Sequence, residues 1–519
     1  MSSYLRRLAT TGAAYTAASI FSKLIAVALL PLYTRYLTKA DYGAAEIIFA
    51  AVVSASIVIR FGTIEALLRF YYKEDEDPDR VVATSFAALF WLATAAALIA
   101  LPFAKPIAEA LLTEEAAMVA SPVELGRIAI GGLWVLTMFE YLLTLFRLEE
   151  RARAFFLTTI FNVVVTIGLT VVLVVGNGEG ARGLLLGSYA AGAVFVAGLI
   201  VVHWRRLSLW VDRPLLRRLM RFGFPTMPAE LSLYLLNFVD RIIIVRVAGL
   251  PAAGLYSLAV KFAQGVNVLV RGFQLAWPPL AYSIRDDGEA RRAYAVIVTW
   301  FVTGCAFVVT GMWLLSRWIV RALAAPEFFG SYKAIGLLAT GVTLYALYMV
   351  LVVILGRTGR TELNLPASLA ALVANIALNL ALVPPLGIVG AGIALVLSYL
   401  VVLALMYGFT QRLFPVPYEW LRLARIVLVS AALVGLGEWL LPTSGLGGLL
   451  ARTVLWLAYP AALLFSGFFT PAERHRLATL RHPSVLLGSL RVLLQQPTEV
   501  EGQVPEAYEA ELMDEDART

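Results

Sequence analysis

Apolar runs long enough to cross a membrane recur along the whole chain, separated by short polar or basic breaks. A hydrocarbon core of about 30 Å needs about 20 apolar residues per helix. Of the 519 residues, 60% are hydrophobic and 15% are charged, whereas soluble domains average about 25% charged residues. The strands of a β-barrel have about ten residues of alternating polarity, unlike these runs of Leu, Ala and Val. We therefore predict an all-α integral membrane protein.

The polar breaks predict about 14 transmembrane helices. The first apolar run carries no small-residue cleavage site, so we interpret it as a retained span rather than a signal peptide. The predicted spans are 10–36, 44–70, 81–103, 124–147, 154–176, 181–204, 219–248, 254–284, 292–317, 332–356, 363–384, 388–412, 420–441 and 446–469.

Lysine and arginine gather in alternate loops, for example "HWRRLSLWVDRPLLRRLMR", while the loops between them are poor in basic residues, as in "KPIAEALLTEEAAMVASPVE". The positive-inside rule then places both termini on the cytoplasmic side of the membrane. The same bias accounts for the formal charge of +7, so nucleic acid is not an expected partner.

The two halves of the chain resemble each other. At one interval of 211 residues, Arg60 corresponds to Arg271 and Gly43 to Gly254. Each copy holds six predicted spans, so both insert the same way up, as parallel repeats. The predicted organisation is an N-terminal six-helix lobe (1–204), a cytoplasmic linker (205–218), a C-terminal six-helix lobe (219–415), two additional helices (416–470) and a partly disordered cytoplasmic tail (471–519).

Two arginines, Arg60 and Arg271, stand inside apolar spans. An arginine at the centre of a membrane helix costs about 2.5–3.5 kcal/mol and usually faces a cavity that carries a substrate or an ion. The alternative is that these side chains snorkel to an interface or pair with a nearby carboxylate.

Polar stripes at helical spacing favour the cavity. They run along the seventh and eighth spans, and Lys23 lies on a weaker stripe in the first. A lumen lined by these residues is predicted to be net cationic and suited to an anionic, hydrated ligand, because arginine matches the oxygens of phosphate. The candidate substrate-binding residues are Lys23, Arg60, Tyr234, Asn237, Arg241, Lys261, Gln264 and Arg271.

Two carboxylates on these stripes, Glu230 and Asp240, are candidates for coupling to H⁺ or Na⁺, although Asp240 could instead pair with its neighbours. No HExxH, CxxC, P-loop or GxSxG motif occurs, and Cys305 is the single cysteine. We therefore predict no catalytic residue, no metal site, no cofactor and no enzymatic activity. A membrane glycosyltransferase or polymerase would need acidic clusters in sizeable polar loops, and no loop is long enough.

Two segments, "SKLIAVALLPLYTRYLTKADYGAAEII" and "FGFPTMPAELSLYLLNFVDRIIIVRVAGLPAAGLYSLAVKFAQGV", carry a family resemblance. Over about residues 5–415 the chain resembles polysaccharide flippases, the O-antigen and exopolysaccharide transporters of the multidrug/oligosaccharidyl-lipid/polysaccharide exporter superfamily. The resemblance implies two six-helix lobes that form a V and open alternately to the two membrane faces. It implies that an undecaprenyl-pyrophosphate-linked oligosaccharide moves from the inner to the outer leaflet without covalent chemistry. It also implies that the chain lies in the cytoplasmic membrane of a bacterial or archaeal cell.

Two other functions within this superfamily stay open. Lipid II flippases have 14 spans, but the first span here lacks their arginine-rich opening and has Lys23 where an arginine is expected. A cation-coupled multidrug exporter would favour an acidic or aromatic cavity. Besides the lipid-linked saccharide and the bilayer, the expected partners include a polysaccharide polymerase or other synthesis machinery.

Overall fold

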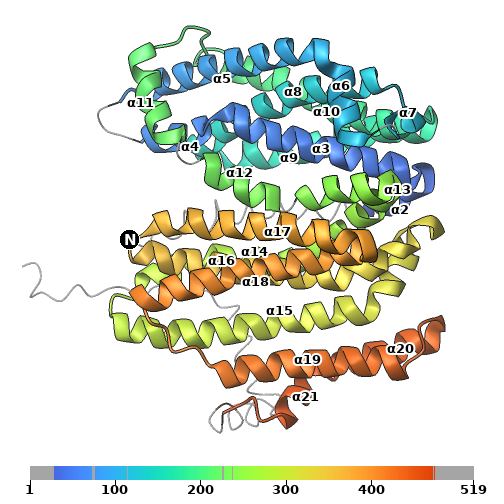
Figure 1. The fold of residues 1–519 in the computed structure, drawn as a ribbon. Helices are drawn as coiled ribbons and strands as arrows, with labels where there is room; N and C mark the ends of the chain where they lie inside the picture. The colour runs from blue at the N-terminus through green and yellow to red at the C-terminus, as the bar shows by residue number, and fades with distance from the viewer. Residues whose placement is uncertain are drawn as a thin grey trace, which may run out of the picture. The chain divides into compact units, whose positions relative to one another are not determined.

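The computed structural model describes residues 28–72, 76–113, 115–224, 227–236, 238–470 and 473, and these contain helices and no strands (Figure 1). Most of the predicted first span, with Lys23, lies outside the described residues, as do Asn237 and the tail from 474 onward. The all-α prediction is confirmed.

The helices of the first half are α2 (Leu30–Tyr36), α3 (Lys39–Arg60), α4 (Thr63–Phe70), α5 (Pro78–Ala100), α6 (Ala104–Leu112), α7 (Ala116–Val119), α8 (Pro122–Leu148), α9 (Ala152–Val171) and α10 (Gly180–His203). The helices that follow are α11 (Arg213–Gly223), α12 (Met227–Leu236), α13 (Val239–Ala263), α14 (Asn267–Ser283), α15 (Asp287–Leu323), α16 (Tyr332–Arg357), α17 (Asn364–Leu386), α18 (Ile388–Leu413), α19 (Trp420–Leu440), α20 (Gly445–Leu457) and α21 (Tyr459–Phe465). Short helical turns η1 (Leu101–Phe103), η2 (Val172–Gly176), η4 (Gln264–Val266), η5 (Pro326–Ser331) and η6 (Thr361–Leu363) extend or join them.

Within the described ranges, 11 helices are long and apolar enough to cross a membrane, or up to 12 if α20 and α21 form one bent span. One of the 11, Glu230–Val266, is interrupted at Gly249, whose φ of 81° and ψ of 172° are not helical. This helix therefore contains parts of both the seventh and the eighth predicted spans. The total of about 14 stays a prediction.

The second predicted span, 44–70, is broken in the structure. Helix α3 begins with a capping box between Thr38 and Asp41 and ends at Phe61, which adopts a left-handed conformation with φ of 45°. Gly62 follows with φ of 69° and precedes α4. Arg60 is therefore the last residue of its helix instead of an interior one, and its side chain can turn away from the helix axis.

The segment between the two halves forms the amphipathic helix α11. Its first residues were predicted to belong to the linker (205–218) and its last ones to the seventh span (219–248). Asp212 caps this helix by accepting a hydrogen bond from the Leu215 N–H at 3.1 Å, and it forms an ion pair with Arg80. These contacts hold the pKa of the Asp212 carboxyl below its ordinary value. The ion pair between Asp212 and Arg80 connects α11 to the start of α5.

The duplication has a structural counterpart at the crossing of α3 and α13. A Cβ atom added to Gly43 would lie 2.3 Å from the carbonyl oxygen of Leu250, and one added to Gly254 would lie 2.1 Å from that of Lys39. The two glycines that correspond in the repeat therefore pack backbone to backbone. In Figure 1, α12 and α13 lie between α3 of the first half and α17 of the second.

Helices α19 and α20, which lie outside the duplication, attach to α15 through polar contacts. Arg452 on α20 is fully buried and donates to Glu438 of α19 at 2.6 Å, while Arg317 of α15 binds the same carboxylate at 2.9 Å. The Trp456 Nε1–H donates to the carbonyl oxygen of Phe307 at 2.8 Å. A carboxylate shared by two arginines thus joins three helices.

We expect Gly254→Ala to destabilise the protein by about 1–3 kcal/mol, because the added methyl group overpacks the α3–α13 crossing. The midpoint of thermal unfolding of the detergent-solubilised protein measures this. The control is Gly198→Ala, since no atom lies within 4 Å of a Cβ added there. Equal midpoints for the two variants would contradict the close crossing.

Candidate functional site

A cavity of about 700 Å³ lies between helices of the two halves. Its wall combines α3 from the first half with α12, α13, η4, α14, α16 and α18 from the second. The lining residues are Glu46, Phe49, Ala50, Val53, Ile57, Glu230, Tyr234, Asp240, Arg241, Tyr256, Val260, Lys261, Ala263, Gln264, Asn267, Arg271, Leu338, Val342, Tyr345, Leu395 and Tyr399.

Most of the predicted site residues gather in this wall. The structure places Glu230, Tyr234, Asp240, Arg241, Lys261, Gln264 and Arg271 there. Arg60 adjoins the cavity through its ion pair with Glu230. These described residues of the polar stripes therefore face a common space, although the seventh span is divided between α12 and α13.

One ion pair crosses the cavity between the two halves near the start of α3. Lys261 of α13 donates to Glu46 of α3, whose side chain is only 8% exposed, and the lysine ammonium also lies 5.4 Å from the centre of the Tyr42 ring. Glu46 is not among the residues predicted from the sequence. The signal was a lone carboxylate inside an apolar span, a feature that marks a function or a partner in a membrane helix.

A second ion pair crosses between the halves at the other end of α3. Arg60 binds Glu140 of α8 at 2.7 Å and Glu230 of α12 at 3.1 Å. The alternative of pairing with a carboxylate, which the sequence left open for Arg60, is the one that the structure shows. Glu140 is a further intramembrane carboxylate that was not predicted from the sequence.

Asp240 is also engaged. It is 1% exposed, and it accepts hydrogen bonds from the Tyr256 hydroxyl and, at 2.7 Å, from the Arg241 N–H. Its partners thus come from its own helix, α13.

Arg241 and Arg271 differ from the other basic groups of this wall. Neither makes an ion pair with any carboxylate that the structure describes, and the Nε of Arg241 is buried without a hydrogen-bond partner there. A buried N–H group without a hydrogen-bond partner is costly. These two side chains are therefore the groups of the described wall that can accept an anionic ligand without first breaking an ion pair.

The described wall is not net cationic, in contrast to the predicted lumen. It carries three basic side chains (Arg241, Lys261 and Arg271) and three acidic ones (Glu46, Glu230 and Asp240). The difference has three causes: Lys23 lies outside the described residues, Arg60 lies beside the cavity and not in its lining, and Glu46 was not among the predicted residues. Positive charge is instead available locally, since the carboxylates are engaged and two arginines are not.

Among the described residues, no group of three His, Cys, Asp or Glu side chains could hold a metal ion. The thiol of Cys305 is buried.

Comparison with known proteins identifies the family. A family model described as "Polysaccharide biosynthesis protein" matches residues 8–285, more than half of the chain. The chain belongs to this family. The predicted resemblance to polysaccharide transporters is thereby confirmed.

The succinoglycan biosynthesis transport protein ExoT of Rhizobium meliloti is 26% identical over 322 residues. The match covers 60% of this chain and 61% of ExoT, so it spans less than two thirds of that relative.

Solved structures show the fold. The lipid II flippase MurJ in its inward closed conformation has a TM-score of 0.70 at 13% identity, covering 88% of this chain and 98% of that one. An inward-facing multidrug resistance transporter of the MATE family, in the MOP superfamily, has a TM-score of 0.61 at 16% identity, covering 77% of this chain and 95% of that one. The protein therefore has the fold of these membrane transporters.

We expect Lys261→Met to destabilise the protein by about 3 kcal/mol, because it leaves Glu46 buried without its partner. The double variant Glu46→Gln/Lys261→Met removes both charges and should lose less than the sum of the two single variants. Thermal unfolding of the four proteins gives the coupling energy of this pair. Additive losses would mean that the ion pair contributes nothing to stability.

Proposed function

We propose that this protein is a flippase that moves an undecaprenyl-pyrophosphate-linked oligosaccharide from the inner to the outer leaflet through the cavity between its two halves. The observation that carries the proposal is the pair Arg241 and Arg271, which face this cavity without an ion-pair partner among the described carboxylates. The family membership, the similarity to ExoT and the fold shared with MurJ support it.

The chemistry of the wall suits a pyrophosphate followed by sugars. Guanidinium groups bind phosphate oxygens through paired, charge-assisted hydrogen bonds. A cavity of about 700 Å³ lies within the range of about 300–1,000 Å³ that is usual for small-ligand sites. Tyr234 and Gln264 offer hydrogen bonds to sugar hydroxyls, and the predicted residues Lys23 and Asn237 would add to this set. The polyprenyl tail stays in the bilayer.

The two ion pairs that join the halves fit alternating access. Glu46 and Arg60 are 14 positions apart on α3, so Lys261–Glu46 and Arg60–Glu230 lie about 21 Å apart along its axis. Opening at the Arg60 end, which is cytoplasmic in the predicted orientation, breaks the Arg60–Glu230 pair. Opening at the other end breaks Lys261–Glu46 and separates Gly43 from Gly254.

The driving force follows from the charge of the ligand. Moving a negative charge out of a cell with a negative interior gains about 2.3 kcal/mol per charge per 100 mV. Coupling to H⁺ or Na⁺ would add to this. Glu230 suits that role better than Asp240, because its side chain is 41% exposed and its partner Arg60 belongs to the other half.

A cation-coupled multidrug exporter is the second candidate, favoured by the aromatic side chains of Phe49, Tyr234, Tyr256, Tyr345 and Tyr399 in the cavity wall. Cationic drugs also need a carboxylate that is free to bind them. Each of the three lining carboxylates already has a partner, while the two arginines have none among the described carboxylates. The charges therefore favour the anionic ligand.

A lipid II flippase would use the same cavity groups, so both saccharides are compared in the flipping assay.

We expect the double variant Arg241→Ala/Arg271→Ala to flip a polyprenyl-pyrophosphate-linked oligosaccharide at least about tenfold more slowly. This corresponds to an activation free energy higher by about 1.4 kcal/mol. Flipping is measured in proteoliposomes as the fraction of labelled saccharide that becomes accessible in the opposite leaflet, with lipid II assayed in parallel. Arg127→Ala, an exposed arginine of α8 outside the cavity, is the control.

In the same assay, Arg60→Ala tests the ion pair between Arg60 and Glu230, and we expect this variant to flip the saccharide more slowly as well.

Unchanged flipping of both saccharides by the Arg241/Arg271 double variant, with the protein folded, would overturn the site. Drug export by the wild type, without saccharide flipping, would favour the second candidate.

A further inference from the structure

Helix α15 is longer than a membrane requires. Its 37 residues extend about 55 Å, against a hydrocarbon thickness of about 30 Å. Its first turns, after the N-cap Asp286, carry the charged residues Asp287, Glu289, Arg291 and Arg292. These turns therefore belong in a membrane interface, beyond the hydrocarbon. In the predicted orientation this is the cytoplasmic interface.

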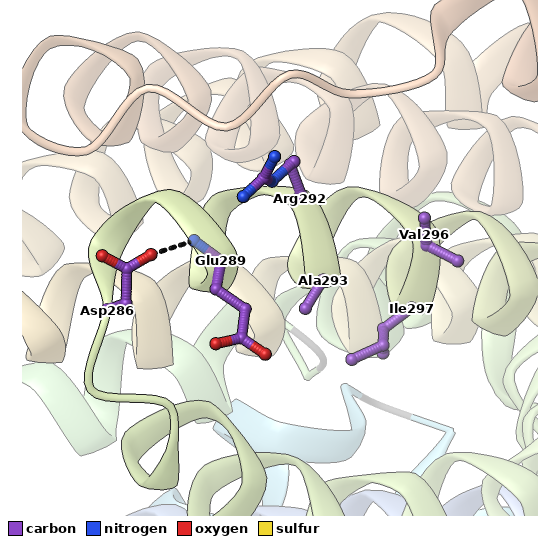
Figure 2. A pocket seen from close by; sticks show the side chains of 6 residues that line it. All are labelled: Asp286, Glu289, Arg292, Ala293, Val296 and Ile297. Carbon is purple, nitrogen blue, oxygen red and sulfur yellow. Dashed lines mark hydrogen bonds between the residues drawn. The ribbon is translucent and has the colours of Figure 1, made fainter.

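A hollow of about 770 Å³ lies along these first turns. Figure 2 shows its six lining residues, which change from charged to apolar along the helix: Asp286, Glu289 and Arg292 come first, then Ala293, Val296 and Ile297. Asp286 accepts a hydrogen bond from the Glu289 N–H at 2.6 Å. Within the described part of the chain, Arg292 makes no ion pair.

A second hollow, of about 850 Å³, continues from the first because Val296 and Ile297 line both. Its other walls are apolar: Gly265, Leu269 and Phe273 from η4 and α14, and Trp300, Phe301 and Val308 from α15. The rings of Phe273 and Phe301 stack at 3.9 Å. Together the two hollows form one groove, which we call the α14–α15 groove.

The groove has the dimensions of half a bilayer. Its apolar part, from Val296 to Val308, rises about 18 Å along α15, close to the roughly 15 Å of one hydrocarbon leaflet. The charged residues precede it by about one to three turns, where a lipid head group lies. One lipid molecule, with its head group at Arg292 and its acyl chains along the apolar part, would therefore match both parts.

We propose that the α14–α15 groove binds one membrane phospholipid whose head group carries a phosphate and a primary ammonium. Arg292 supplies the cation for the phosphate, and the carboxylates of Asp286 and Glu289 accept the ammonium protons. Two carboxylates beside one arginine disfavour a purely anionic lipid, including a polyprenyl pyrophosphate, because like charges repel. The head-group charges thus decide which lipid fits.

This site is separate from the cavity. Gln264, Asn267 and Arg271 line the cavity, whereas Gly265, Leu269 and Phe273 line the groove, so the two lie on different faces of the same helical segment. The inference therefore does not rest on the proposed function.

The test uses the purified full-length protein, reconstituted in vesicles of equal parts phosphatidylethanolamine, phosphatidylcholine and phosphatidylglycerol with a trace of polyprenyl pyrophosphate. After gentle extraction, native mass spectrometry counts the lipids retained per protein. We expect one phosphatidylethanolamine to be retained, at least about fivefold over each other lipid. Arg292→Gln should remove this excess, and Glu289→Gln should abolish the preference over phosphatidylglycerol.

The matched control is Arg153→Gln, an exposed arginine at the start of α9 that should leave retention unchanged. Trp300→Ala tests the apolar part and should lower retention of all phospholipids at this site. Equal retention of the three phospholipids by the wild type, a preference for phosphatidylglycerol or polyprenyl pyrophosphate, or an excess that survives Arg292→Gln would each overturn the proposal.

Discussion

A charge inside a membrane protein must have water or a partner, and this requirement organises the centre of the molecule. Lys261 meets Glu46 and Arg60 meets Glu230, each pair combining one residue from either half of the chain. Breaking such a pair leaves a charge in a medium of low dielectric, which is costly. The pairs therefore hold the halves together and still offer a defined place where they can separate.

The sequence predicted the helices well where apolar runs end at polar breaks, as for α8, α10 and α18. Helical spacing also predicted that Glu230 and Tyr234 would share a face, since both lie on α12. Arg241 lines the same cavity from α13, after a break between the two helices that the spacing did not predict. Partners on other helices could not be predicted in this way, and so Glu46 and Glu140 were missed.

Local backbone conformation was a second limit. The left-handed Phe61 ends α3 although the surrounding residues continue an apolar pattern, so a hydropathy pattern does not register this break. Gly249, by contrast, interrupts α13 between the predicted seventh and eighth spans. The duplication predicted which positions correspond in the two halves, but corresponding residues have different surroundings. Arg60 forms ion pairs with two carboxylates, whereas its counterpart Arg271 forms none with the described residues.

The contact between Gly43 and Gly254 has a mechanical consequence. Without interlocking side chains, two helices can swivel about their crossing with little loss of packing, so the glycine pair can act as a fulcrum. Arg60 lies 17 positions along α3 from Gly43, a lever arm of about 25 Å, so that a swivel of about 10° displaces it by about 4 Å. That displacement exceeds the reach of its hydrogen bond to Glu230 while moving the nearby Glu46 by less than about 1 Å.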